Sequence, residues 1–123
     1  MRKLVPPAFF KIQTMRKLKY QYYDKADRFT DVLIKRINKA VGVDITIQTR
    51  RQEFAYGRFL YCYFARKYTR RYPLVRIGKK IGRDHATVLY GFGRACDLQD
   101  YRPFEIIFDK IDRSVIQDVI NSN

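Results

Sequence analysis

The chain has 123 residues, and its 26 Lys and Arg residues against 12 Asp and Glu residues give a formal net charge of +14. This length suits one compact domain, and so positive a charge favours a partner that carries phosphate, either nucleic acid or an anionic membrane surface. No apolar run approaches the length of about 18 residues that a membrane-spanning helix needs, and the start lacks an apolar segment long enough for secretion, so we expect a cytoplasmic protein.

Residues 1–25 form the first block, in which seven Lys or Arg residues face a single acid, Asp24. Pro6 and Pro7 break any helix that would precede them, and the large residues that follow make no clean apolar stripe. We interpret the block as a basic, aromatic-rich arm that is either loosely ordered or packed as a helix. Such an arm can contact phosphates or a minor groove, or it can be a solubilising tail.

Residues 26–123 are predicted to form one helical domain. Its first helix begins near Thr30 and ends at Gly42. The apolar face of this helix is expected to hold Val32, Leu33, Ile34, Ile37, Ala40 and Val41. The connector that follows, 43–48, is β-branched but finds no second strand pattern to pair with, so the predicted fold class is all-α.

The second helix is predicted from about Arg51 to Thr69, where a basic turn ends it. Cys62 lies in its apolar pattern, and Cys96 lies in that of a later helix. Two cysteines in such patterns are expected to be small core residues rather than metal ligands or a disulfide.

Residues 74–98 predict a helix-turn-helix: a short helix from Leu74 to Ile81, a turn at Gly82, and a second helix that starts near Asp84. The polar leading edge of the second helix holds His85, Thr87, Tyr90 and Arg94, and its apolar stripe holds Val88, Leu89, Phe92, Ala95 and Cys96. A glycine turn between two such helices is typical of a DNA reader, although many other αα-hairpins share it.

The last helix is predicted from about 102 to 120, because Pro103 suits a helix start. Its apolar stripe holds Phe104, Ile107, Phe108, Ile111, Val115 and Val119. Residues 99–123 carry three cations and five acids. We therefore interpret this helix as a buttress over the core rather than as a nucleic-acid surface.

Residue patterns for catalysis are missing from the sequence. The spacing of Gly78 and Gly82 does not fit a phosphate loop, and Gly91 and Gly93 lack the strand and the third glycine of a dinucleotide fingerprint. A single His leaves little for a zinc site, and no nucleophile–base pair is apparent. We expect no enzyme activity, no cofactor and no metal.

Two segments resemble a known family. Ile81-Gly-Arg-Asp-His-Ala-Thr-Val-Leu-Tyr90 is similar to the signature Gly-Gly-Arg-Asp-His-Thr/Ser-Thr-Val of the C-terminal DNA-binding domain of the bacterial replication initiator DnaA. Upstream, Thr49-Arg-Arg-Gln-Glu-Phe-Ala-Tyr-Gly-Arg58 resembles the family's basic loop and the start of its long helix. The resemblance covers roughly residues 30–113. It implies an all-helical domain with a Trp-repressor-like helix-turn-helix that reads a short duplex site, the DnaA box.

The resemblance also implies roles for single residues. Arg50 would be the basic-loop arginine in the minor groove, where an arginine meets enhanced negative potential. The base-reading first turn of the recognition helix would be Asp84, His85, Ala86 and Thr87, although Asp84 can also be the N-cap of that helix. Contacts to the DNA backbone are expected from Arg51, Arg58, Arg70, Arg71, Lys79, Lys80 and Arg83.

The chain departs from the family pattern at three places in the recognition motif. A single Gly82 stands for two glycines, Ala86 replaces a Thr or Ser, and Tyr90 stands where His is usual. These changes can move preference at one or two base pairs by about 1–3 kcal/mol each, so the resemblance leaves the exact DnaA-box-like site open.

The DnaA ATPase domain has no counterpart here, so the resemblance implies a stand-alone relative of bacterial, phage or mobile-element origin. A protein partner, such as a separate replication ATPase, is left open. The leading hypothesis is sequence-specific binding of double-stranded DNA in replication initiation or its regulation. The alternative is a structural RNA- or anionic-surface-binding protein that uses the basic arm.

Overall fold

The computed structural model describes the backbone of residues 7–121 and the side chains of residues 18–117 other than Tyr20. Every regular element in this part of the chain is a helix, which confirms the predicted all-α fold. In chain order the elements are α1 (Pro7–Val41), α2 (Gln52–Tyr68), α3 (Leu74–Lys79), α4 (His85–Asp97), the 3-10 helix η1 (Leu98–Asp100) and α5 (Arg102–Asn121).

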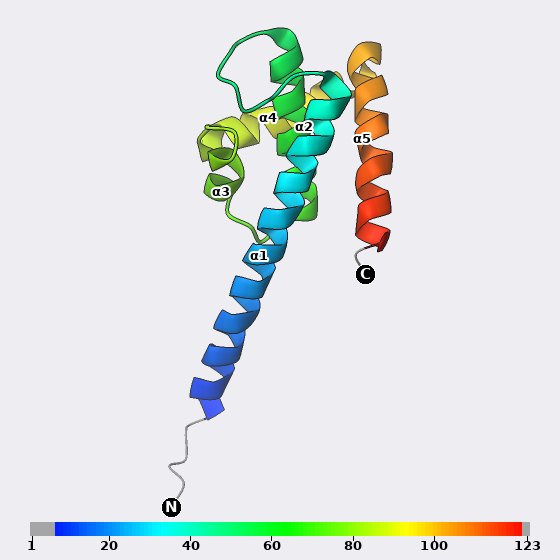
Figure 1. Ribbon diagram of the computed structural model, residues 1–123. Coiled ribbons are helices and arrows are strands. Elements are labelled where there is room, and N and C mark those ends of the chain that lie inside the picture. Colours follow the sequence, from blue (N-terminus) through cyan, green and yellow to red (C-terminus); the bar gives the residue numbers. More distant parts are fainter. Residues whose placement is uncertain (1–6, 122–123) are drawn as a thin grey trace, which may run out of the picture.

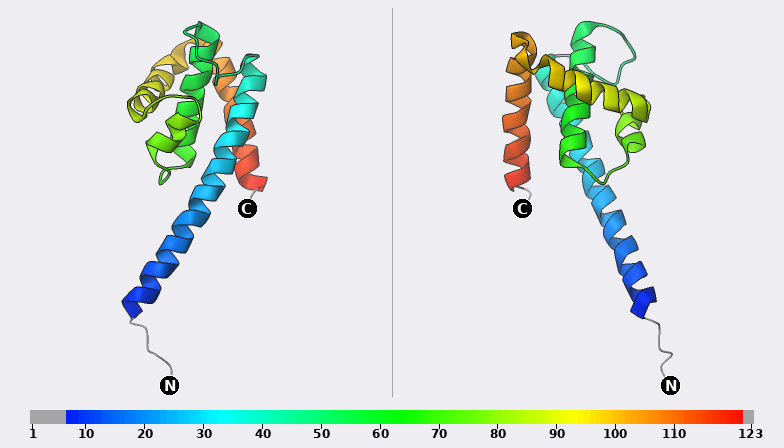
Figure 2. Two further views of the ribbon diagram at one scale, coloured as in Figure 1. Left: turned by 60° about the vertical axis from the view of Figure 1, so that its left-hand side comes forward. Right: turned by 180° about the vertical axis from the view of Figure 1, so that it is seen from behind.

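The helices are arranged around α2, which lies at the centre of the body (Figure 1). α4 crosses α2 on one side, α1 packs against α2 on another, and α5 lies beside the upper part of α1 (Figure 2). The side chains that fill the space between these helices are fully buried, and the largest include Leu33, Ile37, Leu60, Tyr61, Phe64, Ile77, Val88 and Phe104. Since both helices of the helix-turn-helix pack on α2, their positions are fixed by this core.

The first helix is much longer than predicted. It begins at Pro7 rather than near Thr30, so most of the predicted arm is helical. Residues 1–6 of that arm, and the side chains up to Lys17, lie outside the described residues. The predicted apolar face is also wrong at Val32, which is 44% exposed, whereas Leu33 is buried.

The buried stripe of α4 differs from the predicted one. The helix packs through Val88, Gly91 and Ala95, while Leu89 and Cys96 are exposed. A Cβ atom on Gly91 would lie only 2.8 Å from the sulfur of Cys62 in α2. The close approach of the two helices at Gly91 therefore turns Leu89 and Cys96 outward. The prediction of a core cysteine is confirmed for Cys62 and wrong for Cys96.

The last helix begins at Arg102, which agrees with the predicted start at about residue 102. Its residues Phe104, Ile111 and Val115 are buried against the body, and the side chain of Val119 lies outside the described residues. Among the residues that the structure describes, no helix is long and apolar enough to cross a membrane.

Candidate nucleic-acid interface

The turn between α3 and α4 depends on two glycines. Gly82 has a φ of +67°, a left-handed conformation in which a side chain would be strained. Gly78 lies directly beneath the turn, where a Cβ atom would come within 2.4 Å of the carbonyl oxygen of Arg83. The amide of Arg83 donates to the carbonyl of Gly78 at 2.8 Å. A single left-handed glycine is therefore sufficient to join the two helices tightly.

The first turn of α4 presents polar groups to solvent. Asp84 caps the helix, and its Oδ1 accepts a hydrogen bond from the Thr87 amide at 2.8 Å. Hydrogen bonds from the amide and the hydroxyl of Thr87 hold the pKa of Asp84 below its usual value. His85 and Ala86 are exposed and Thr87 is half-buried. The predicted N-cap role of Asp84 is confirmed, and its side chain is ionised at neutral pH.

The loop of residues 42–51, which joins α1 to α2, is attached to this turn by Gln48. The side-chain amide of Gln48 donates to the carbonyl oxygens of Ile81 and Thr46, both at 3.1 Å. It lies so close to Gly82 that a Cβ atom there would be 2.7 Å from its nitrogen. Ile45 anchors the same loop in the core with no exposed surface. The loop and the turn are thereby held as one unit.

Arg58 holds the loop from the other side. Its guanidinium Nη2 donates to the carbonyl oxygens of Ile47, at 3.0 Å, and Thr49, at 2.6 Å. The side chain is 6% exposed, and its Nε is buried without a hydrogen-bond partner among the described residues. Burial, and then the charge of nearby Arg83, lower the pKa of Arg58. The guanidinium of Arg58 therefore holds the loop in place, and its contact with the DNA backbone stays a prediction.

These contacts bring the predicted reading elements to one edge of the molecule. The loop that carries exposed Arg50 and Arg51 lies above the start of α4 in both Figure 1 and the rear view of Figure 2. Arg83 is half-buried in the turn between α3 and α4, and Lys79 is exposed at the end of α3. The edge therefore combines a basic loop with an exposed helix N-terminus.

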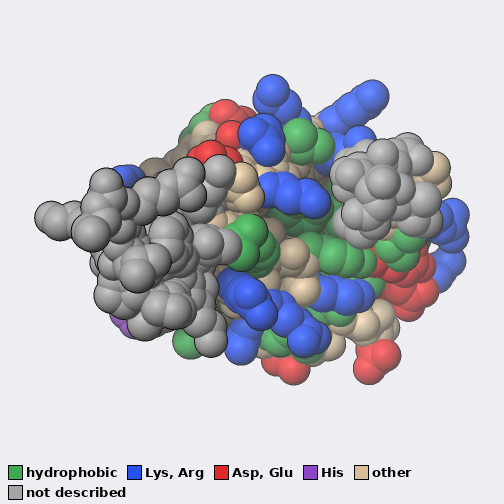
Figure 3. Space-filling view, turned by 90° about the horizontal axis from the view of Figure 1, so that it is seen from below, with side chains coloured by type: hydrophobic (Ala, Val, Ile, Leu, Met, Phe, Trp, Pro, Cys, Tyr) green, Lys and Arg blue, Asp and Glu red, His purple; other side chains and the backbone are tan. Residues whose placement is uncertain are grey.

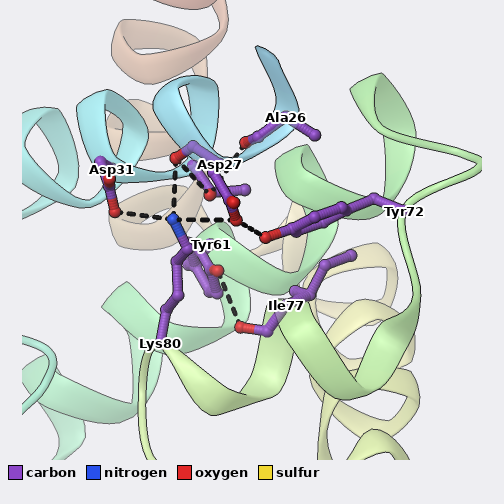
Figure 4. Close-up of polar contacts among 8 residues, drawn as sticks. Ala26, Asp27, Asp31, Tyr61, Tyr72, Ile77 and Lys80 are labelled. Atoms are coloured by element: carbon purple, nitrogen blue, oxygen red, sulfur yellow. Dashed lines mark hydrogen bonds and ion pairs between the residues drawn. The ribbon is translucent and has the colours of Figure 1, made fainter. Parts of the chain in front are cut away.

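Lys80 makes contacts within the protein that the sequence did not indicate. Its Nζ donates to Asp31 Oδ1 and to the carbonyl of Asp27, each at 2.8 Å, and lies 3.6 Å from Asp27 Oδ1 (Figure 4). The Tyr72 hydroxyl also donates to the Asp27 carboxylate. Lys80 thus joins α1 to the helix-turn-helix through the two carboxylates. Its contact with the DNA backbone stays a prediction.

Arg70 and Arg71 are exposed but lie far from Arg51. They follow the far end of α2, whose 17 residues separate them from Arg51 by about 25 Å at 1.5 Å per residue. The amide of Arg71 donates to the hydroxyl of Tyr22 at 3.1 Å, which places this turn against α1. Among the residues predicted to contact the DNA backbone, Arg51 therefore lies at one end of α2 and Arg70 and Arg71 lie at the other.

The sequence patterns did not predict a basic groove at the end of α2. Its cavity of about 580 Å³ is lined by cations of α2, including Arg66 and Lys67, and by Phe92 of α4. The Arg66 guanidinium lies 4.7 Å from the centre of the Phe92 ring, and the Lys67 ammonium lies 5.7 Å from that of Tyr63. Figure 3 shows Lys and Arg side chains gathered on this lower face. Only the run of cations at the end of α2 could have indicated the groove.

Comparison with known proteins gives one match. A sequence model described as the bacterial dnaA protein helix-turn-helix matches residues 32–94, just over half of the chain. The match includes the end of α1, the loop with Arg50, all of α2 and α3, and α4 as far as Arg94. No curated protein and no solved structure matches the chain.

Proposed function

The chain belongs to the family of bacterial DnaA helix-turn-helix domains, a DNA-binding family, and from this we propose that it recognises a specific sequence in double-stranded DNA. The first turn of α4, Asp84–Thr87, enters the major groove, and Arg50 enters the adjacent minor groove. The protein acts at the nucleoid in the initiation of replication or in its regulation, as a binding protein without a catalytic step.

One observation carries this proposal: the loop with Arg50 and the start of α4 form a single unit. Gln48 joins the loop to the turn, and Arg58 holds the loop carbonyls from beneath. A major groove admits an α-helix, and a narrow minor groove attracts arginine. Because these contacts hold the loop beside the start of α4, the two elements would meet neighbouring grooves of one duplex.

The chemistry of the first turn suits base reading. The methyl group of Ala86 and the ring of His85 can pack against a thymine methyl, and the Thr87 hydroxyl can bond to a base edge. Ionised Asp84 can accept from the amino group of a cytosine while it caps the helix. Arg51, Lys79 and Arg83 surround this turn and supply phosphate contacts, which set the register without reading sequence.

Selection of bound duplexes from a random pool tests the proposal. We expect one recovered motif, related to the DnaA box but altered where Ala86 and Tyr90 replace the residues that the family usually has. Affinity for that duplex is then compared with affinity for a scrambled duplex and for a structured RNA at physiological salt. Equal binding of the scrambled duplex would contradict sequence recognition, and preferred binding of the RNA would favour the RNA-binding alternative.

A further inference from the structure

The first part of α1 projects from the body of the molecule (Figures 1 and 2). The first buried side chain among the described residues of this helix is Ala26. The segment 7–25, called the arm here, therefore extends by about 28 Å at 1.5 Å per residue. Its sequence carries five cations and one acid, Asp24, and the described cations Lys19 and Lys25 are exposed.

The direction of the arm is set by contacts with the helix-turn-helix. The Arg76 guanidinium lies 4.7 Å from the centre of the Tyr23 ring, and the Lys19 ammonium lies 5.5 Å from it. The Tyr23 ring also packs edge-on against the ring of Tyr72, with 5.8 Å between their centres. The hydroxyl of the adjacent Tyr22 accepts from a backbone amide in the turn before α3. The base of the arm is thus attached directly to the first helix of the reading motif.

A second set of contacts holds the same junction. Asp27, four residues after Tyr23, receives hydrogen bonds from Tyr72 and from Lys80, and Lys80 also pairs with Asp31 (Figure 4). The tyrosine and lysine donors come from either end of α3. Because both ends of α3 are joined to α1, the arm cannot rotate about its base without breaking the junction.

Three features follow one another along a single edge of the molecule. Figure 1 shows the 42–51 loop at the top, the start of α4 in the middle and the arm at the bottom of that edge, and the rear view in Figure 2 shows the same order. A duplex whose grooves receive Arg50 and α4 would continue past α3 towards the arm. A length of about 28 Å along the duplex axis corresponds to about eight base pairs at 3.4 Å each.

We propose that the arm is a second DNA contact, which follows the phosphate backbone of the duplex that flanks the recognition site. The contacted flank lies at the end of the site opposite to the base pairs that Arg50 reads. The inference rests on the proposed function. It makes the footprint asymmetric, since phosphate contacts extend over a flank of up to about eight base pairs on one side only.

Trimming the flanks of the selected duplex tests this directly. The 123-residue chain is titrated onto duplexes shortened stepwise from one end or from the other, and the variant Arg50→Ala identifies which end of the motif the loop reads. We expect shortening at the opposite end to weaken binding several-fold and to lower the log–log salt slope by about 0.9 for each phosphate that the arm can no longer reach. Equal effects of shortening at the two ends would overturn the proposal.

A charge-matched pair of variants localises the effect to the arm. Lys19→Gln with Lys25→Gln removes two arm cations, and Lys110→Gln with Arg113→Gln removes two exposed cations from α5. The arm variant should lower the salt slope by about two on the long duplex and leave it unchanged on the duplex trimmed at the arm end. On each of the two duplexes, the salt slope of the α5 variant should equal that of the unmodified protein.

Two further measurements separate the charge of the arm from its geometry, and the arm proposal from the proposed function. Lys25→Gln alone removes one charge and leaves the contacts of Tyr23 with Lys19, Arg76 and Tyr72 in place. A decrease of about one in the salt slope of this variant would therefore come from the lost charge and not from a changed arm geometry. An equal loss in the arm variant on both duplexes would overturn the proposal. Binding of the selected and the scrambled duplex is also compared on the trimmed form. If the selected duplex is still preferred but flank length has no effect on affinity, only the arm proposal fails. If the selected duplex is not preferred, the proposed function fails.

Discussion

His85 and Thr87 lie on the first turn of α4, which is free to meet a base edge, whereas Lys79 is exposed at the end of α3. We predict that His85→Ala or Thr87→Ala lowers discrimination at particular base pairs by about 1–3 kcal/mol. Lys79→Ala should instead weaken all sequences about equally and lower the salt slope by about one. Titration of a panel of single-base variants of the selected duplex separates the two patterns. The same pattern from all three variants would count against α4 as the recognition helix.

Arg58 holds the loop that carries Arg50 through hydrogen bonds to two loop carbonyls. Removing its side chain leaves the carbonyls of Ile47 and Thr49 without their donor, and hydrogen bonds from a charged group contribute about 1.5–3 kcal/mol. We predict that Arg58→Met lowers the free energy of unfolding by roughly this amount and relaxes preference at the minor-groove base pairs. Urea denaturation and the duplex panel measure the two effects. Arg51→Met, which changes an exposed neighbour of the loop, should leave stability nearly unchanged.

Asp84 makes stability depend on pH in a defined direction. Its pKa is lowered in the folded protein, chiefly by the hydrogen bond from the Thr87 amide. A carboxylate of this kind adds stability above the unfolded pKa of about 3.9, and the contribution is lost as pH falls through the folded pKa. We predict that the difference in unfolding free energy between the unmodified protein and Asp84→Ala is complete at neutral pH and shrinks below about pH 4.

Asp84→Asn is the control for this titration. Asparagine caps helices about as well as aspartate but does not ionise. This variant should keep most of the stability at neutral pH and lose the acid dependence. A difference between Asp84→Ala and the unmodified protein that stays constant into acid would show that the carboxylate charge is not responsible.

Residue types and spacing predicted the N-cap at Asp84 but not the positions of Arg58 and Lys80. A cap depends on a partner three residues away, so it is visible in a local pattern. Lys80 finds its partners on Asp31 and Asp27, 49 and 53 positions earlier in the chain, and Arg58 reaches back across the loop. The sequence showed two basic residues beside a helix-turn-helix, and only the fold showed the contacts that both make within the protein.

Among the elements, α4 shows how a glycine can decide which face of a helix is buried. The predicted stripe was drawn from apolar side chains, but the helix packs through Gly91, because a missing Cβ allows the backbone to approach Cys62. A hydropathy pattern gives no weight to a glycine and therefore placed Leu89 and Cys96 inside. The helix itself and its start were predicted, because Asp84 and the preceding Gly82 are local signals.

Two glycines of α4 provide a matched test of that packing. A Cβ on Gly91 would meet the sulfur of Cys62 at 2.8 Å, whereas a Cβ on Gly93 has no heavy atom within 4 Å. Alanine raises helix propensity by about 1 kcal/mol at either position, and overpacking costs about 1–3 kcal/mol. We predict that Gly93→Ala raises the free energy of unfolding by up to about 1 kcal/mol, while Gly91→Ala lowers it or leaves no gain. Equal stabilisation in urea denaturation would contradict the close approach.

At the scale of the whole molecule, the length of α1 was the largest difference from prediction. Its first part makes no apolar stripe, so the sequence left open whether residues 1–25 were loose or helical. Tyr23 packs against Tyr72 and Arg76, which lie some fifty residues later. Such a contact leaves no periodic signal in the helix that makes it. The all-α class and the helix-turn-helix were predictable, since both follow from patterns confined to single elements.

The junction of α1 with the helix-turn-helix gives a whole-molecule prediction from two neighbouring lysines. Lys80 is bonded to Asp27 and Asp31, whereas Lys79 is exposed. We predict that Lys80→Gln lowers the free energy of unfolding by about 1 kcal/mol and leaves the salt slope on a trimmed duplex unchanged. Lys79→Gln should change stability by less than about 0.5 kcal/mol and lower that slope by about one.

Lys80→Gln and Lys79→Gln are a matched pair, because each removes one positive charge and the two positions are adjacent. A uniform effect of net charge would therefore change binding equally in the two proteins. If Lys80→Gln lowered the salt slope as much as Lys79→Gln and left stability intact, Lys80 would contact phosphate, and the junction would open when DNA binds. The opposite result would establish that the chain separates two tasks between neighbouring lysines: one holds α1 against the reading motif, and the other meets the duplex.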